Sequence, residues 1–197
     1  MQLNCDAILC ALRPHGEHGV IARCLTAEAG LLPGYVRGGR SRRMKPILIP
    51  GNVLAADFRA RTTEQMPSLT AELAHSRGAL LNEPLPAAAI DWVTTLTAAA
   101  LPEGQSYPQL YTALSAVLDA IELGGVARRW AIGVVRFESL MLEALGYGTP
   151  GDATQDLRQA LARNGRALDD HVLNGPRMQG AADTRERMIT RMLRGIA

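Results

Sequence analysis

Residues 20–36 read VIARCLTAEAGLLPGYV. Two short apolar runs lie in this stretch, at 20–26 and 31–36, and the segment between them ends at Gly30, a typical turn residue. Short runs rich in apolar and β-branched residues, bounded by turn signals, are typical of β-strands. The stretch therefore predicts two consecutive strands.

Three further runs extend this pattern on both sides. Residues 3–12 end before the turn residues Pro14 and Gly16, and residues 52–60 and 68–74 alternate between two faces. Several short strands at this spacing are typical of a small antiparallel barrel or sandwich. The five-stranded OB-fold is the most economical architecture of this kind.

Beyond residue 80 the apolar residues recur at helical spacing. Leu110, Leu114, Leu118 and Ile121, for example, follow one another every three or four residues and form one face. The pattern predicts helices at 83–101, 107–123, 126–145, 152–163 and 184–193, with an irregular segment at 164–183. The predicted fold class is α+β, with an OB-fold barrel in 1–78 followed by an α-helical domain in 79–197.

Composition excludes several classes of protein. Hydrophobic residues make up 47% of the chain and charged residues 20%, which is typical of globular proteins. No apolar run approaches the roughly 20 residues that span a bilayer, and no basic region precedes an apolar stretch as in a signal peptide. The three cysteines, Cys5, Cys10 and Cys24, form no CxxC pair and lie in apolar runs, which predicts core thiols. We therefore expect a cytoplasmic protein without disulfides, bound metal or cofactor.

The strongest local feature is a basic segment directly after the third predicted strand. Five cations fall in nine residues around Gly38 and Gly39: Arg37, Arg40, Arg42, Arg43 and Lys45. Such cations can neutralise phosphates, and Tyr35 before them could stack on a base. We therefore predict a mobile loop that binds nucleic acid, with Arg13 and Arg23 as weaker phosphate contacts. The alternative is a solvated loop whose charges only maintain solubility.

Candidates for catalysis are few. His15 and His18 flank a glycine and a glutamate between two predicted strands, which indicates a surface turn rather than a metal site. Asp170 and His171 have no nucleophile or second ligand near them in the sequence. The chain contains no P-loop and no GxSxG motif. We therefore predict that the protein is not an enzyme.

The predicted helix at 126–145 carries both apolar residues and arginines. Trp130 and Phe137 fall at helical spacing and indicate core positions. The alternative for this face is a groove that receives the hydrophobic tail of a partner protein, with Arg128, Arg129 and Arg136 binding its carboxylates.

Two motifs, in this order, resemble the bacterial RecO family of recombination mediators. The first is Arg13-Pro14-His15-Gly16-Glu17, followed by Val36-Arg37-Gly38-Gly39-Arg40. The second begins Arg136-Phe137-Glu138 and ends Leu145-Gly146-Tyr147, and the segment at 107–114 gives a weaker third match. The resemblance covers about 150 residues, and the order and spacing of the motifs make it specific.

The resemblance implies an N-terminal OB-fold, a helical C-terminal domain and a role in DNA repair and recombination. Such proteins bind single- and double-stranded DNA, anneal complementary strands, and work with RecR to load RecA onto DNA coated by single-strand-binding protein. They also bind the acidic C-terminal tail of that protein. The chain departs from many relatives because no cysteine follows Cys24, so we expect no zinc-binding insertion after Tyr147. We expect the irregular segment at 164–183 to stand in a shortened region.

The sequence therefore predicts a non-enzymatic DNA-repair mediator of the cytoplasm, associated with the nucleoid. Its barrel would hold strands by their phosphates, which carry no sequence information. The alternative function is a protein-interaction adaptor that uses the helical groove and whose basic loop is incidental.

Overall fold

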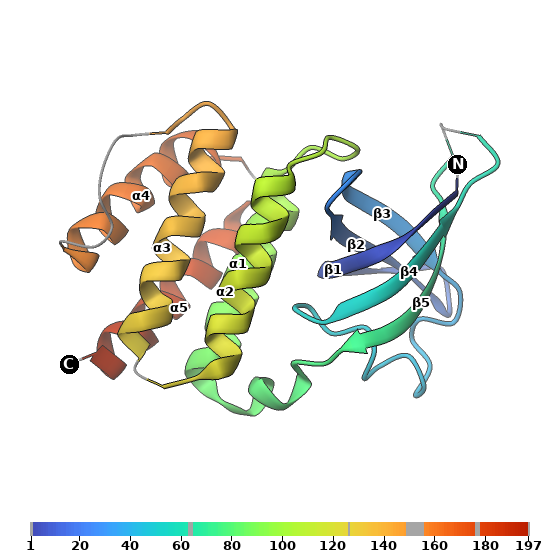
Figure 1. The fold of residues 1–197 in the computed structure, drawn as a ribbon, viewed down its shortest axis with the longest axis horizontal. Coiled ribbons are helices and arrows are strands. Elements are labelled where there is room, and N and C mark those ends of the chain that lie inside the picture. Colours follow the sequence, from blue (N-terminus) through green and yellow to red (C-terminus); the bar gives the residue numbers. More distant parts are fainter. Residues whose placement is uncertain (1, 63–64, 126, 149–155, 176–177, 197) are drawn as a thin grey trace.

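The structure is a computed structural model that describes the chain except residues 1, 63–64, 126, 149–155, 176–177 and 197; the side chains of 127, 128, 179, 195 and 196 also lie outside the description. A β-barrel forms one end of the molecule, and a bundle of helices packs against one side of it (Figure 1). The strands end at His75, and the first helical turn begins at Gly78.

The barrel confirms the predicted OB-fold. Its strands are β1 (Gln2–His15), β2 (Gly19–Thr26), β3 (Gly30–Val36), β4 (Val53–Arg59) and β5 (Ser68–His75). They close in the order β1-β2-β3-β5-β4, with antiparallel pairs except between β3 and β5. Each strand lies within three residues of the range that the sequence predicts, because the apolar runs and turn residues there are local signals.

Strand β1 closes the barrel because it pairs on both sides. Its first half pairs with β4 and its second half with β2, with an irregularity in the β2 register between Leu9 and Ala11. Inside the barrel, the apolar core includes Leu9 and Phe58, both fully buried. Ile8 and Cys10 belong instead to a second core, which the helices cover.

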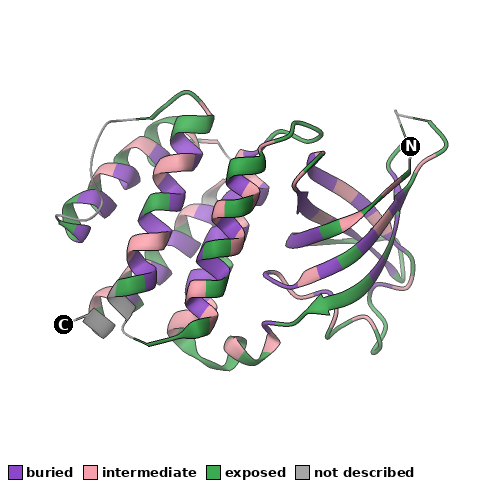
Figure 2. Ribbon diagram, viewed as in Figure 1, coloured by how far each residue is buried: buried purple, intermediate pink, exposed green. Residues whose placement is uncertain are grey.

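The helices bury this second core against the outer surface of the barrel. They are η1 (Gly78–Asn82), α1 (Pro84–Ala100), α2 (Pro108–Leu123), α3 (Ala127–Ala144), α4 (Leu157–His171) and α5 (Gln179–Ile196). Figure 2 shows buried positions along the sides of the helices that face one another. Trp92 of α1 lies at the centre, and the same cluster reaches Leu25 and Leu31 of the barrel. The helices and one outer face of the barrel therefore share this second core, whereas the interior of the barrel has its own.

The loop between α1 and α2 joins the helices to the turn between β2 and β3. The Gly104 amide donates to the Leu31 carbonyl at 3.0 Å, and the Ser106 hydroxyl donates to the Ala27 carbonyl at 3.1 Å. Gly30 has a φ of +69°, and a Cβ there would lie 1.7 Å from the Gln105 carbonyl oxygen. Only glycine therefore allows this close approach of the two backbones.

The predicted irregular segment at 164–183 is wrong over 164–171 and 179–183, which belong to α4 and α5. The reason lies at Gly165, which a sequence pattern treats as a helix breaker. A Cβ at Gly165 would lie 2.6 Å from the Arg185 guanidinium, so glycine makes room for this side chain between the helices. The predicted start of a helix at residue 152 lies outside the described residues.

No helix among the described residues is long and apolar enough to span a membrane.

Candidate nucleic-acid interface

The segment that connects β3 to β4, residues 37–52, is called the basic loop below. It consists of successive turns, in which the Leu48 amide donates to the Met44 carbonyl at 2.8 Å. Leu48 is buried in the barrel core, and Met44 and Ile47 pack against the same core. The prediction of a mobile loop is therefore wrong for the end of the loop, where the apolar side chains of Met44, Ile47 and Leu48 fasten it to the barrel.

All five predicted cations of the basic loop are exposed: Arg37, Arg40, Arg42, Arg43 and Lys45. Arg40 also fastens the start of the loop to the turn between β1 and β2. Its amide donates to the His18 carbonyl at 3.2 Å, and its guanidinium donates to the Glu17 carbonyl at 3.1 Å. Figure 1 shows this loop, in light blue, at the lower edge of the barrel. Arg40 therefore holds the start of the basic loop beside the β1–β2 turn.

Tyr35 is half-buried at the end of β3. Its ring packs against Gly19 and meets the His15 ring edge to face, with 5.8 Å between ring centroids. This packing joins β3 to the β1–β2 turn beneath the basic loop. Base stacking by Tyr35 stays a prediction. The ring already packs against His15 and Gly19 on either side of the turn.

Arg13 and Arg23 line a hollow of about 480 Å³ on the outer surface of β1, β2 and β3, together with Met66 from the β4–β5 loop. Arg13 is exposed. The Arg23 guanidinium instead donates to the Ala98 carbonyl and forms an ion pair with Glu103 at 3.1 Å. The Arg23 guanidinium is therefore already paired with a carboxylate, which makes it less available to a phosphate.

Acidic side chains gather elsewhere on the barrel. A hollow of about 560 Å³ on β1, β4 and β5 is lined by Asp6, Asp57 and Glu72 among others. A polyanion is repelled by these carboxylates and attracted by the basic loop. Asp57 is already paired with Arg59 at 2.7 Å, so the contrast in charge between this hollow and the basic loop rests on Asp6 and Glu72.

The cysteines behave as core residues. Burial raises the pKa of the Cys10 thiol to about 12 and that of Cys24 well above its ordinary value. Burial, with smaller contributions from Glu28 and Asp6, also raises the pKa of Cys5. A thiol needs a lowered pKa to act as a nucleophile near neutral pH, so none of the three is activated.

The other candidates for chemistry lie on the surface. His15 ends β1 and His18 lies in the β1–β2 turn; both side chains are exposed. His171 stacks on Tyr147 with ring centroids 4.5 Å apart. Within the described ranges, no three His, Cys, Asp or Glu side chains come together in a geometry that could hold a metal ion.

Helix α3 presents the predicted partner face in part. Arg129 and Arg136 are exposed and lie two turns apart on one side of the helix, whereas the Arg128 side chain lies outside the described residues. Leu140, one turn after Arg136, lines a hollow of about 370 Å³ with Tyr107 of the preceding loop and six other residues. The two cations and the hollow therefore follow one another along α3, and the hollow is lined by polar as well as apolar residues, among them Glu143.

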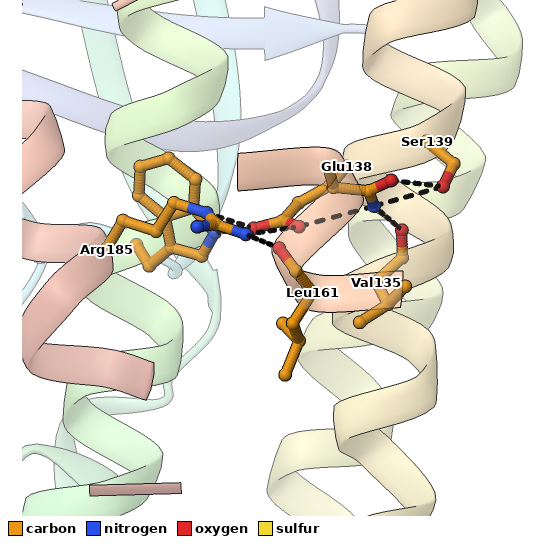
Figure 3. Close-up of polar contacts among 7 residues, drawn as sticks. Val135, Glu138, Ser139, Leu161 and Arg185 are labelled. Atoms are coloured by element: carbon orange, nitrogen blue, oxygen red, sulfur yellow. Dashed lines mark hydrogen bonds and ion pairs between the residues drawn. The ribbon is translucent and has the colours of Figure 1, made fainter. Parts of the chain in front are cut away.

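Two residues that the sequence analysis did not assign form the polar centre of the helical bundle (Figure 3). Glu138 of α3 is fully buried, and its carboxylate pairs with Arg185 of α5 at 2.8 and 3.1 Å. The Trp92 indole donates to the same carboxylate at 2.9 Å, and Arg185 donates to the Leu161 carbonyl of α4 at 2.9 Å. The network therefore joins α1, α3, α4 and α5. The signal was present in the sequence, since Glu138 stands at a helical spacing otherwise occupied by apolar residues.

The comparisons with known proteins agree with this architecture. The family model described as "Recombination protein O N terminal" matches residues 1–77, and "Recombination protein O C terminal" matches 83–154. Three relatives, each named DNA repair protein RecO, show the extent of the similarity. The protein of Rhodospirillum centenum is 42% identical over 149 residues, which cover 75% of this chain and 58% of the relative. That of Caulobacter sp. is 35% identical over 178 residues, covering 90% and 69%, and that of Jannaschia sp. 37% over 175 residues, covering 85% and 70%.

The matches thus span between 58% and 70% of the length of these three curated relatives. Both family models follow the order of the barrel and the helices, and together they cover most of the chain. The chain therefore belongs to the RecO family of DNA repair proteins.

Proposed function

We propose that the protein is a DNA repair and recombination mediator that binds single- and double-stranded DNA through the basic loop. The observation that carries this proposal is the set of five exposed cations on one loop that is fastened to the barrel core. The cations would contact phosphates and release counterions, so binding would be independent of base sequence. The OB-fold barrel, residues 1–78, would be the DNA-binding domain and residues 79–197 the α-helical domain.

The same chemistry supports strand annealing. Two strands held by their backbones repel each other less once cations neutralise their phosphates, and base pairing then selects the product. We propose that the protein anneals strands in this way and, with RecR, helps to load RecA onto DNA coated by single-strand-binding protein. Annealing and loading need no bond to be made or broken in the protein's own site, so we propose that it is not an enzyme. With chromosomal DNA as ligand, its place would be the cytoplasm, at the nucleoid.

Titration of labelled single-stranded DNA at several salt concentrations tests DNA binding. We expect the logarithm of the binding constant to fall linearly with the logarithm of the salt concentration, with a slope of about −3 if four or five cations contact phosphates. Oligonucleotides of different sequence should bind equally well. Absence of binding at low salt would instead favour the adaptor that uses its helical face.

For the helical face, we propose the acidic C-terminal tail of single-strand-binding protein as the ligand. The exposed Arg129 and Arg136 would attract its carboxylates, and the hollow at Leu140 would receive its apolar end. Arg128 belongs to the same proposal by its position in the sequence. Such peptides are flexible, and the loss of their conformational freedom opposes binding.

We expect a labelled tail peptide to bind the full chain with a dissociation constant on the order of micromolar, because peptide ordering offsets part of the contact energy. Replacing Arg129 and Arg136 by alanine should weaken binding about tenfold, largely through the association rate. Stopped-flow fluorescence measures the association and dissociation rate constants, whose ratio gives the dissociation constant. Arg166→Ala, on the exposed side of α4, is the control and should leave binding unchanged. Equal affinity of the double variant and the control would move the tail away from α3.

A further inference from the structure

The end of the basic loop is held by one fully buried side chain, Asn52. Its amide nitrogen donates to the carbonyls of Pro46 at 3.2 Å and Ile47 at 3.0 Å, directly after Lys45. Its amide oxygen accepts from the backbone N–H of Arg77 at 2.8 Å. Both donors and the acceptor of the side chain are therefore used, and they draw the loop into a closed turn against the end of β5.

Arg77, which is 3% exposed, completes this anchor. Its guanidinium donates to the Gly51 carbonyl at 2.7 Å and pairs with two carboxylates of α2, Asp119 and, at 3.1 Å, Glu122. The two carboxylates balance the charge of the buried guanidinium, which would be costly to bury alone, although its Nε makes no hydrogen bond. The end of the loop is therefore attached to β5 and to α2 through Asn52 and Arg77, whose side chains are both buried.

The start of the loop is attached separately, where Arg40 binds the carbonyls of the β1–β2 turn. Between the two attachments lie Arg42, Arg43 and Lys45, which are exposed and have no hydrogen bond or ion pair through their side chains to any residue that the structure describes. A segment ordered before its ligand arrives loses less entropy on binding. The anchors thus lower the cost of presenting three cations on one surface.

We propose that Asn52 and Arg77 are positioning residues for DNA, which hold the basic loop in its binding conformation and tie that conformation to α2. Neither residue contacts the ligand in this arrangement, since both are buried behind the loop. The inference rests on the proposed function of the loop. It adds that two residues other than the cations, Asn52 and Arg77, contribute to the affinity for DNA.

The test separates position from charge. Asn52→Ala removes no cation, so it should leave the salt dependence of DNA binding unchanged and weaken binding about tenfold at every salt concentration, because the loop must now be ordered by DNA. Hydrogen exchange of the amides of Met44, Ile47 and Leu48 should accelerate in the free protein. Arg77→Lys, which keeps the charge but loses the guanidinium fork, is the second variant and should give a smaller effect of the same kind.

Asn82→Ala, an exposed asparagine of η1, serves as the matched control. Wild-type affinity in both anchor variants, with accelerated exchange in the loop, would overturn the inference, as would unchanged exchange. If instead Arg42, Arg43 and Lys45 can all be replaced without effect on DNA binding, the proposed function of the loop fails, which is a separate result from failure of the anchor. A thermal melt shows that each variant is folded at the temperature of the titration.

Discussion

Glu138→Ala is expected to lower the free energy of unfolding by about 3–5 kcal/mol, the largest effect on stability of any substitution considered for this protein. The variant leaves the Arg185 guanidinium buried without its carboxylate and removes the acceptor of the Trp92 indole. Net stabilities of folded domains are about 5–15 kcal/mol, so such a loss consumes a large share of the total. Urea denaturation, followed by circular dichroism, measures the change as a lower midpoint.

Glu143→Ala is the matched control, because this glutamate lies on the same helix but is exposed. Its effect should stay within about 0.5 kcal/mol. The double variant Glu138→Leu with Arg185→Met should be more stable than Glu138→Ala, since no charge is then buried alone. A loss below about 1 kcal/mol for Glu138→Ala would contradict a central role of this network.

Replacing Arg42, Arg43 and Lys45 together by alanine is expected to have the largest effect on DNA binding. If each contacts a phosphate, the salt dependence of single-strand binding becomes shallower by about 2 in slope, and affinity near 0.1 M salt falls on the order of a hundredfold. Arg40 is left in place because it also anchors the loop, so its removal would combine the loss of a charge with the loss of an anchor. Fluorescence anisotropy with labelled oligonucleotides of two sequences measures affinity and slope.

The control removes the same number of charges from the helices, at Arg158, Arg166 and Arg194, all exposed. It should change the slope little, because the lost cations lie on α4 and α5 and not on the barrel. If control and loop variant weaken binding equally, DNA responds to net charge and not to the basic loop.

Local signals in the sequence predicted the barrel. Apolar runs between turn residues mark strands through the preferences of a few neighbouring residues, and the five strands lie close to their predicted ranges for that reason. The burial of Cys10 and Cys24 was also predicted from their apolar surroundings, as was the exposure of His18 in a turn. The five cations fall within nine residues of the chain, and each is exposed, as expected for a charged segment.

The sequence by itself therefore determined the OB-fold, the first three α-helices, the basic segment and the family, because periodicity, turn chemistry and motifs operate over short distances along the chain. Only the tertiary structure decided that Arg23 is occupied by Glu103, that Glu138 pairs with Arg185, and that Gly165 continues a helix. It also decided that the basic loop is ordered, through Asn52 and Arg77. The partners in these contacts are between 5 and 80 residues apart along the chain. Whether a charged side chain is free or paired therefore depends on the residues that tertiary packing brings beside it.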